Sequence, residues 1–72
     1  MKVYDFLGYC PPSQEIEIWI KPLFSNRYTR YTADICDEIR NDQWTMDTLK
    51  VATLTSVFVN TDGVLVLHGI EE

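Results

Sequence analysis

The sequence predicts a small α+β domain, in which two short helices pack on an antiparallel sheet of three to four strands in the order α-β-β-α-β-β. Residues 15–21 alternate strictly between polar and apolar side chains, as in a strand with one buried face. Two runs rich in β-branched residues, at 55–60 and 64–68, flank Asp62-Gly63, and this arrangement is typical of a β-hairpin. The 72 residues predict a single domain over 1–72.

A short helix is expected over residues 2–9. Its apolar positions recur at helical spacing, at Val3, Phe6 and Leu7. Pro11-Pro12 cannot continue a helix, because proline lacks the backbone N–H and clashes with the preceding turn. We therefore expect the helix to end near Gly8 and to cover one face of the sheet.

Two strands are expected next. In the first, the alternation divides the side chains between an inward set, Ile16, Ile18 and Ile20, and an outward set, Glu15, Glu17, Trp19 and Lys21. Pro22 ends this strand, and Ser25-Asn26 supplies turn residues. Residues 27–31 combine basic, aromatic and β-branched side chains, and they predict a second strand at the edge of the sheet.

The second helix is expected from about Ala33 to Asn41. Thr32 is a candidate N-cap, and Asp34 falls in the first turn, where the helix dipole favours negative charge. The apolar stripe of this helix consists of Ile35, Cys36 and Ile39. Residues 43–47 are expected to form a connector without helix or strand.

The closing hairpin is apolar on both faces. Its expected alternation places Val57, Val59, Val64 and Val66 on one side, and Phe58, Leu65 and Leu67 on the other. A free two-layer domain needs only one apolar face, so the second must be covered by a helix or by a partner. We also expect a bend where residues 52–55 break the alternation.

The charge balance restricts the class of partner. With 11 acidic and 6 basic residues, the net charge of −5 disfavours direct binding to nucleic acid or anionic membranes and favours a protein with a basic surface. No apolar run reaches the roughly 18 residues of a membrane-spanning helix, and no leader-like segment opens the chain, so we expect a cytoplasmic protein. Cys10 and Cys36 are expected to be reduced thiols, with a disulfide and a metal site as alternatives.

Four carboxylates recur at spacings of three and four residues and would form an acidic ridge on the second helix: Asp34, Asp37, Glu38 and Asp42. Two interpretations stay open, a solvated helix face and a surface that docks on a basic partner. Trp19, facing outward from its strand, and Trp44, in the connector, are candidates for lids on the core or for anchors in an interface.

Nothing in the sequence favours enzyme chemistry. His68 is the only histidine, and we expect it to be exposed at the end of a strand without a nucleophile and an orienting acid beside it. The three glycines are scattered and form no phosphate-binding loop. We therefore predict a non-enzymatic protein with no cofactor and no metal.

Three features together resemble small acidic accessory proteins of phages and prophages. They are Val3-Tyr4-Asp5-Phe6-Leu7 before the two prolines, the alternating strand from Glu15 to Ile20, and the hairpin from Val57 to Leu67 around Asp62-Gly63. The resemblance spans most of the chain. It implies a role in inhibiting a bacterial host system, as anti-CRISPR proteins do when their acidic residues occupy the nucleic-acid surface of a nuclease. It implies the host cytoplasm as location and assigns no site residue.

Two hypotheses follow. The first is a protein that binds and inhibits or modulates a larger, basic host protein through the acidic ridge, with Trp44 and Trp19 as nearby anchors. The second is a self-associating structural module, a homodimer for example, that uses the apolar hairpin face of Phe58, Leu65 and Leu67.

Overall fold

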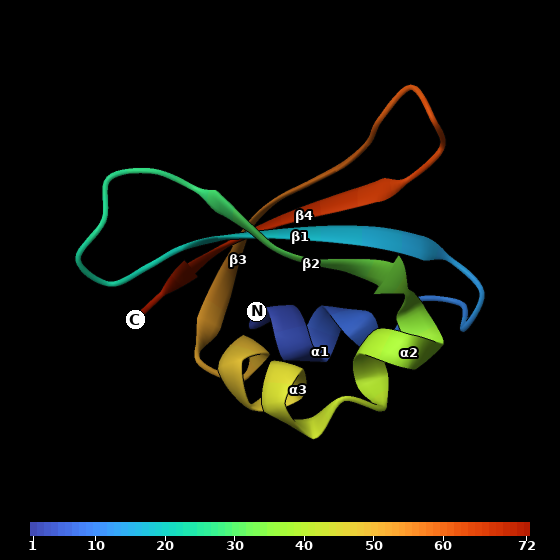
Figure 1. The fold of residues 1–72 in the computed structure, drawn as a ribbon, viewed down its shortest axis with the longest axis horizontal. Coiled ribbons are helices and arrows are strands. Elements are labelled where there is room, and N and C mark those ends of the chain that lie inside the picture. The colour runs from blue at the N-terminus through green and yellow to red at the C-terminus, as the bar shows by residue number, and fades with distance from the viewer.

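The computed structural model describes residues 1–72 and has three helices on one face of a four-stranded sheet (Figure 1). In chain order the elements are α1 (Val3–Leu7), β1 (Glu15–Lys21), β2 (Thr29–Ile35), α2 (Cys36–Arg40), α3 (Gln43–Leu49), β3 (Ala52–Val59) and β4 (Leu65–Glu71). The predicted α+β class is confirmed. No helix has the length and apolar character needed to cross a membrane.

The sheet has the order β2-β1-β4-β3 and is mixed. The pairs β1–β2 and β3–β4 are antiparallel hairpins, as expected. The prediction of an entirely antiparallel sheet is wrong, because β1 and β4 run parallel at the centre. This parallel pairing places the more buried strand of each hairpin in the middle of the sheet. The connection that parallel strands require runs through β2, α2, α3 and β3.

The core lies between the sheet and the helices. As predicted, Ile16, Ile18 and Ile20 face it, each at most 4% exposed. They pack in one cluster with side chains from all three helices and from the strands: Val3, Leu7, Cys10, Cys36, Ile39, Leu49, Ala52 and Leu67. Both cysteines are free thiols and buried, in agreement with the predicted reduced state.

The helix expected at 33–41 begins later than predicted. Residues 29–35 form a strand, and Thr32 lies within it instead of capping a helix. The reason is tertiary: the start of β1 needs hydrogen-bond partners, and Asp34 and Ile35 pair with Ile16 and Glu15. The first N–H groups of α2 donate to backbone carbonyls of Gln14 and Pro12, at 2.8 and 2.9 Å. No side-chain cap is therefore required.

The connector expected at 43–47 is also wrong, because those residues belong to α3. Asp42 is the N-cap, and its side chain accepts a hydrogen bond from the Thr45 N–H at 3.3 Å. Leu49 is fully buried and Met46 packs against the core cluster. Burial of these two side chains, three residues apart, holds this short helix on the core.

The hairpin loop has three residues, 61–63, instead of the two that Asp62-Gly63 would form. Asn60 pairs with Val64, its side chain accepts from the N–H groups of Asp62 and Val64, and Gly63 has a φ of 78°. This is a three-residue loop, in which the left-handed residue is glycine. The longer loop shifts the register by one residue, so Phe58 pairs with Val66, and Val57 with Leu67.

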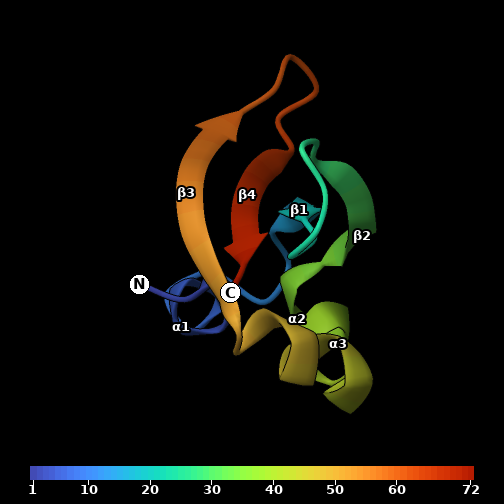
Figure 2. The same ribbon diagram turned by 90° about the vertical axis from the view of Figure 1, so that its left-hand side faces the viewer.

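The expected face assignment of the hairpin is therefore wrong in part. Leu65, Leu67, Val57 and Val59 share the face of the helices, whereas Phe58 and Val66 share the opposite face. The expected bend is confirmed, because the β3–β4 register shifts between Leu54 and Ser56. Figure 2 shows the consequence: the helices gather along one side of the curved sheet, and no helix covers the other side.

Candidate binding surface

An aromatic cluster occupies the sheet face opposite the helices, which we call the open face. His68 of β4 lies at its centre. The Tyr28 ring stacks on the imidazole, with centroids 4.7 Å apart and planes 25° apart. Phe58 and Trp19 approach the imidazole edge-on, with centroid distances of 5.5 and 6.5 Å. Residues from both hairpins thus meet on one surface.

Tyr28 reaches across the whole sheet. It precedes β2, the strand at one edge, yet its hydroxyl lies 3.0 Å from Thr55 Oγ1 on β3, the strand at the other edge. The Thr55 hydroxyl donates to the His68 carbonyl at 3.1 Å, so it can accept a hydrogen bond from Tyr28. Thr55 occupies the register shift of β3, which turns its side chain toward this partner.

A groove opens beside this cluster. It has a volume of about 430 Å³ and is lined by Glu17, Trp19, Tyr28, Phe58, Asn60, Val66 and His68. Parallel pairing of β1 with β4 aligns Glu17 with Val66, and Trp19 with His68, which places these side chains on one face. The Trp19 indole N–H donates to Glu17 Oε1, and the second carboxylate oxygen has no partner within the chain.

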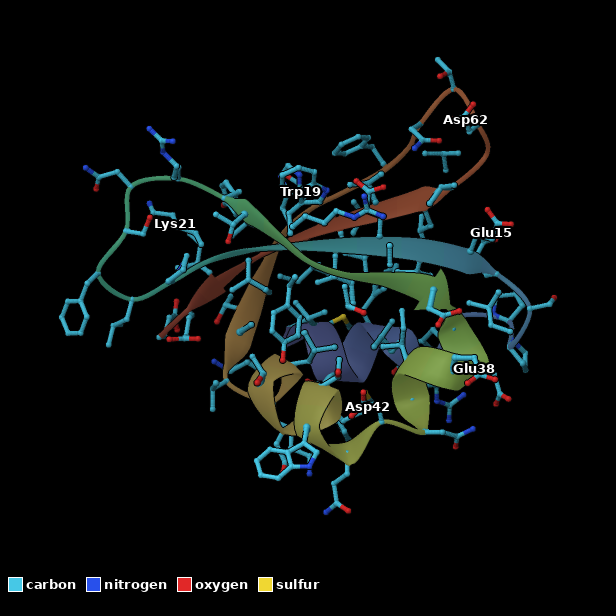
Figure 3. The ribbon with its side chains drawn as sticks, in the orientation of Figure 1. Glu15, Trp19, Lys21, Glu38, Asp42 and Asp62 are labelled. Atoms are coloured by element: carbon cyan, nitrogen blue, oxygen red, sulfur yellow. The ribbon has the colours of Figure 1, made fainter.

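A second feature, the acidic end, adjoins the open face. It consists of Glu15, Asp34, Asp37, Glu38 and Asp62, all exposed. Strand pairing and the contacts of residues 12–14 bring these segments together: α2 begins against Pro12 and Gln14, and the Gln14 side chain donates to the Gly63 carbonyl at 3.5 Å. None of the five carboxylates lies within 4.0 Å of a basic group. In Figure 3, Glu15, Glu38 and Asp62 lie toward one end and Lys21 toward the other.

The acidic ridge does not exist as one helix face. Asp34 lies on β2, Asp37 and Glu38 lie on α2, and Asp42 caps α3. Three of these four residues nevertheless meet at the acidic end, because β2 runs directly into α2. Asp42 is separate and has a structural role as the N-cap.

The two tryptophans lie on different layers of the molecule. Trp19 is partly buried in the open face, above the sheet in Figure 3. Trp44 belongs to α3 in the helical layer and is 86% exposed, so it is no lid on the core. A partner that binds a single face of the domain would contact one tryptophan and not the other.

The hairpin residues expected to mediate self-association do not form one exposed face. Leu67 is fully buried beneath the helices, and Leu65 packs against the core cluster. Phe58 lies on the open face and is 47% exposed. The chain's own helices therefore cover Leu67 and part of Leu65 on this side of the hairpin, whereas Val57 and Val59 on the same side stay exposed.

Sequence reasoning missed three members of the open face: Glu17, Tyr28 and His68. The prediction of an exposed His68 is wrong, because three aromatic rings surround a half-buried imidazole. The outward alternation of β1 was the available signal for Glu17, and the aromatic content of residues 27–31 was the signal for Tyr28. The signal for His68 depends on knowing that β1 and β4 are neighbours.

Both thiols lie in the core, and the environment of Cys10 makes it unreactive. Burial, the neighbouring Cys36 charge and a hydrogen bond to Cys36 raise the pKa of Cys10. The Cys36 thiol lies 3.5 Å from the Leu7 carbonyl and 3.8 Å from that of Cys10. A buried thiol with a raised pKa is a weak nucleophile, so Cys10 contributes to packing, as Cys36 does through its complete burial in the core.

A larger hollow of about 520 Å³ lies on the helical side, lined by Met1, Tyr4, Asp5, Gly8, Tyr9, Arg40 and Met46. Asp5 is engaged there, because its carboxylate accepts a hydrogen bond from the Lys2 N–H at 3.3 Å. The groove on the open face is the stronger candidate for a cationic group, since its lining combines three aromatic rings with a carboxylate and contains no lysine or arginine, whereas Arg40 lines the larger hollow. The chain matches no protein-family model, and no curated protein or solved structure was found to match it.

Proposed function

We propose that this chain is a non-enzymatic protein that binds and modulates a larger protein with a basic surface. One observation carries the proposal: a sheet face that no helix covers displays an aromatic cluster, and unpaired carboxylates flank it at the acidic end. Aromatic side chains supply binding energy at the centre of an interface, and charges at the rim speed encounter.

The charge distribution supports a basic partner. Two of the six basic residues, Lys2 and Lys50, pair with Glu72 and Asp47, away from the acidic end. The five carboxylates of the acidic end have no ion-pair partner. An anionic partner such as a nucleic acid would be repelled. A basic protein surface that otherwise binds the phosphate groups of a nucleic acid would be attracted.

We further propose that the partner is a protein of a bacterial host and that binding inhibits it. The support is the resemblance to acidic phage accessory proteins, together with the negative charge. On this proposal the acidic end and the open face occupy a surface that otherwise binds nucleic acid, and the chain acts in the host cytoplasm. An anti-defence role, such as inhibition of a CRISPR nuclease, is the most specific form of this proposal.

A charge-reversal experiment tests it. The triple variant Glu15→Lys, Glu38→Lys and Asp62→Lys reverses the acidic end, whereas Asp47→Lys, Glu71→Lys and Glu72→Lys make the same change in net charge elsewhere. Captured host proteins are identified by mass spectrometry, and the purified candidate is bound to each variant by surface plasmon resonance. We expect the first variant to lower the association rate at least about tenfold and the control to lower it far less.

The salt dependence provides an independent check. Raising the salt from about 50 to about 300 mM should slow association with the wild type, because surface charges are screened over a shorter distance. The proposal fails if both triple variants bind equally well, or if no host protein binds the wild type specifically.

A second candidate function is self-association along β3. It is supported by the position of β3 at the sheet edge and by three consecutive exposed apolar residues, Val57, Phe58 and Val59, at 42%, 47% and 62%. Light scattering after size exclusion would detect it as a dimer whose fraction rises with concentration and falls on Val59→Lys substitution.

A further inference from the structure

The groove on the open face has the chemical character of a site for a cationic side chain. Trp19, Tyr28 and Phe58 line it, and the negative face of an aromatic ring attracts a cation. Glu17 is the single carboxylate in its lining. The Glu17 carboxylate is held in place by the Trp19 indole N–H, which occupies one oxygen and leaves the other free.

The lining distinguishes between kinds of cation. A guanidinium group is planar, stacks on aromatic rings and donates several N–H groups in one plane to a carboxylate. A lysine ammonium is compact and strongly hydrated, and it gains less from an open, apolar groove. The groove is open to solvent and its size of about 430 Å³ suits a side chain presented by a larger molecule.

We propose that this groove binds an arginine side chain of the basic partner, with the guanidinium stacked on the aromatic rings and hydrogen-bonded to Glu17. This inference rests on the proposed function, because it names the group that a basic partner inserts. Arg30 lines the neighbouring hollow together with Glu15 and Glu17 and forms no ion pair within 4.0 Å. The chain's own cation thus leaves the Glu17 carboxylate available.

The site can be tested without the partner. Acetyl-Gly-Arg-Gly-amide is titrated into the ¹⁵N-labelled full-length chain, and binding is followed by NMR at the Trp19 indole N–H and the backbone N–H groups of Phe58 and His68. The Trp44→Phe variant identifies which indole signal belongs to Trp19. Matched peptides carry lysine or citrulline, the neutral isostere of arginine. We expect saturable shifts at the groove with arginine, at least about fivefold weaker binding with lysine, and none with citrulline.

Two variants separate the groove from general electrostatics. Glu17→Gln should weaken arginine binding at least about fivefold, whereas Glu15→Gln removes the same charge from the same strand outside the groove and should change it less than twofold. Phe58→Leu keeps the apolar surface and removes a ring, and it should weaken binding as well. Dispersed NMR spectra establish that each variant is folded.

The outcomes are distinct. Equal shifts with arginine and citrulline, equal effects of Glu17→Gln and Glu15→Gln, or shifts confined to the acidic end would overturn the arginine site. Concentration-dependent shifts at the groove without peptide would also overturn it, because a second copy would then be the occupant. A failed arginine titration with partner binding still sensitive to the acidic-end variant would leave the proposed function standing. If the groove binds the arginine peptide but no partner is sensitive to the acidic-end variant, the arginine site stands and the proposed function fails.

Discussion

The ring of Tyr28 stacks on the imidazole of His68, 4.7 Å away, and so joins the loop of the first hairpin to a central strand of the second. The two hairpins are otherwise held together by β1–β4 pairing and by the core beneath. Together with the contact between the Tyr28 hydroxyl and Thr55, this stacking places the Tyr28 side chain across the open face. Tyr28 therefore stabilises the fold and also lines the groove.

Substitutions of Tyr28 can separate its two contacts. Tyr28→Phe removes only the hydroxyl and should lower the free energy of unfolding by about 0.5–1 kcal/mol, at the low end because the bond is exposed. Tyr28→Ala also removes the stacked ring and should lower it by about 1–2 kcal/mol. Urea denaturation followed by circular dichroism measures both. Equal effects of the two variants would mean that the stacking contributes nothing.

The local patterns that predicted the fold correctly share one property, which is that their signal lies in consecutive residues. The alternation of Ile16, Ile18 and Ile20 defines β1 and its buried face, and the two prolines end α1. The Asp42 cap with Met46 and Leu49 behind it was also a local signal, for α3. This signal is weak because the helix is short and, apart from Trp44, its other residues are polar.

Other features depend on contacts that are distant in sequence. Asp34 has helical neighbours in the chain, but its pairing with Ile16 of β1 places it in a strand. The surroundings of His68 follow from the parallel β1–β4 pair, which brings Trp19 beside it. Tyr28 reaches the cluster because its side chain extends across the sheet to His68 and Thr55. A single sequence contains no direct information about such neighbours, and the open face could not be assembled from it.

The division of the hairpin between two faces makes a sharp prediction for stability. Leu67→Asp buries a charge without a partner among the helices and should leave the chain unfolded at 25 °C. Phe58→Asp introduces the same group on the half-exposed open face and should leave the fold intact. One-dimensional NMR distinguishes a dispersed from a collapsed spectrum. A folded Leu67→Asp protein would contradict the face assignment that follows from the three-residue loop.

Gly63 tests that loop directly. Its φ of 78° is strained for a residue with a Cβ atom, although no atom lies within 4 Å of the Cβ position. Gly63→Ala should therefore cost about 1 kcal/mol through the backbone alone. Gly63→Asn should cost less, because asparagine tolerates this region better. Thermal unfolding of both variants gives the ranking, and an equal loss for alanine and asparagine would argue against a left-handed residue here.

At Gly69 the constraint is different: the backbone conformation would allow a side chain, but neighbouring side chains leave no space for a Cβ atom. A Cβ atom there would lie 2.7 Å from Val3 Cγ2 and 3.3 Å from Ile20 Cδ1. Gly69→Ala should push α1 away from the sheet and lower stability by about 1–3 kcal/mol. The double variant Gly69→Ala, Val3→Ala removes the clashing methyl group. It should lose less than the sum of its two single variants, as urea denaturation can measure.

The thiol of Cys10 makes stability depend on pH on the alkaline side. Burial and the neighbouring Cys36 raise its pKa in the folded state above the ordinary value of 9.0, so the unfolded chain loses this proton at a lower pH than the folded chain does. The stabilisation is complete below the unfolded pKa and declines as the pH rises through the folded pKa. Cys10→Ala should therefore flatten the fall in unfolding free energy between about pH 8 and pH 10. Urea denaturation at a series of pH values over that range gives the slope of unfolding free energy against pH for the wild type and for Cys10→Ala. Tyrosines and lysines contribute equally to both slopes. Parallel slopes would mean that the Cys10 thiol ionises equally in the folded and the unfolded chain.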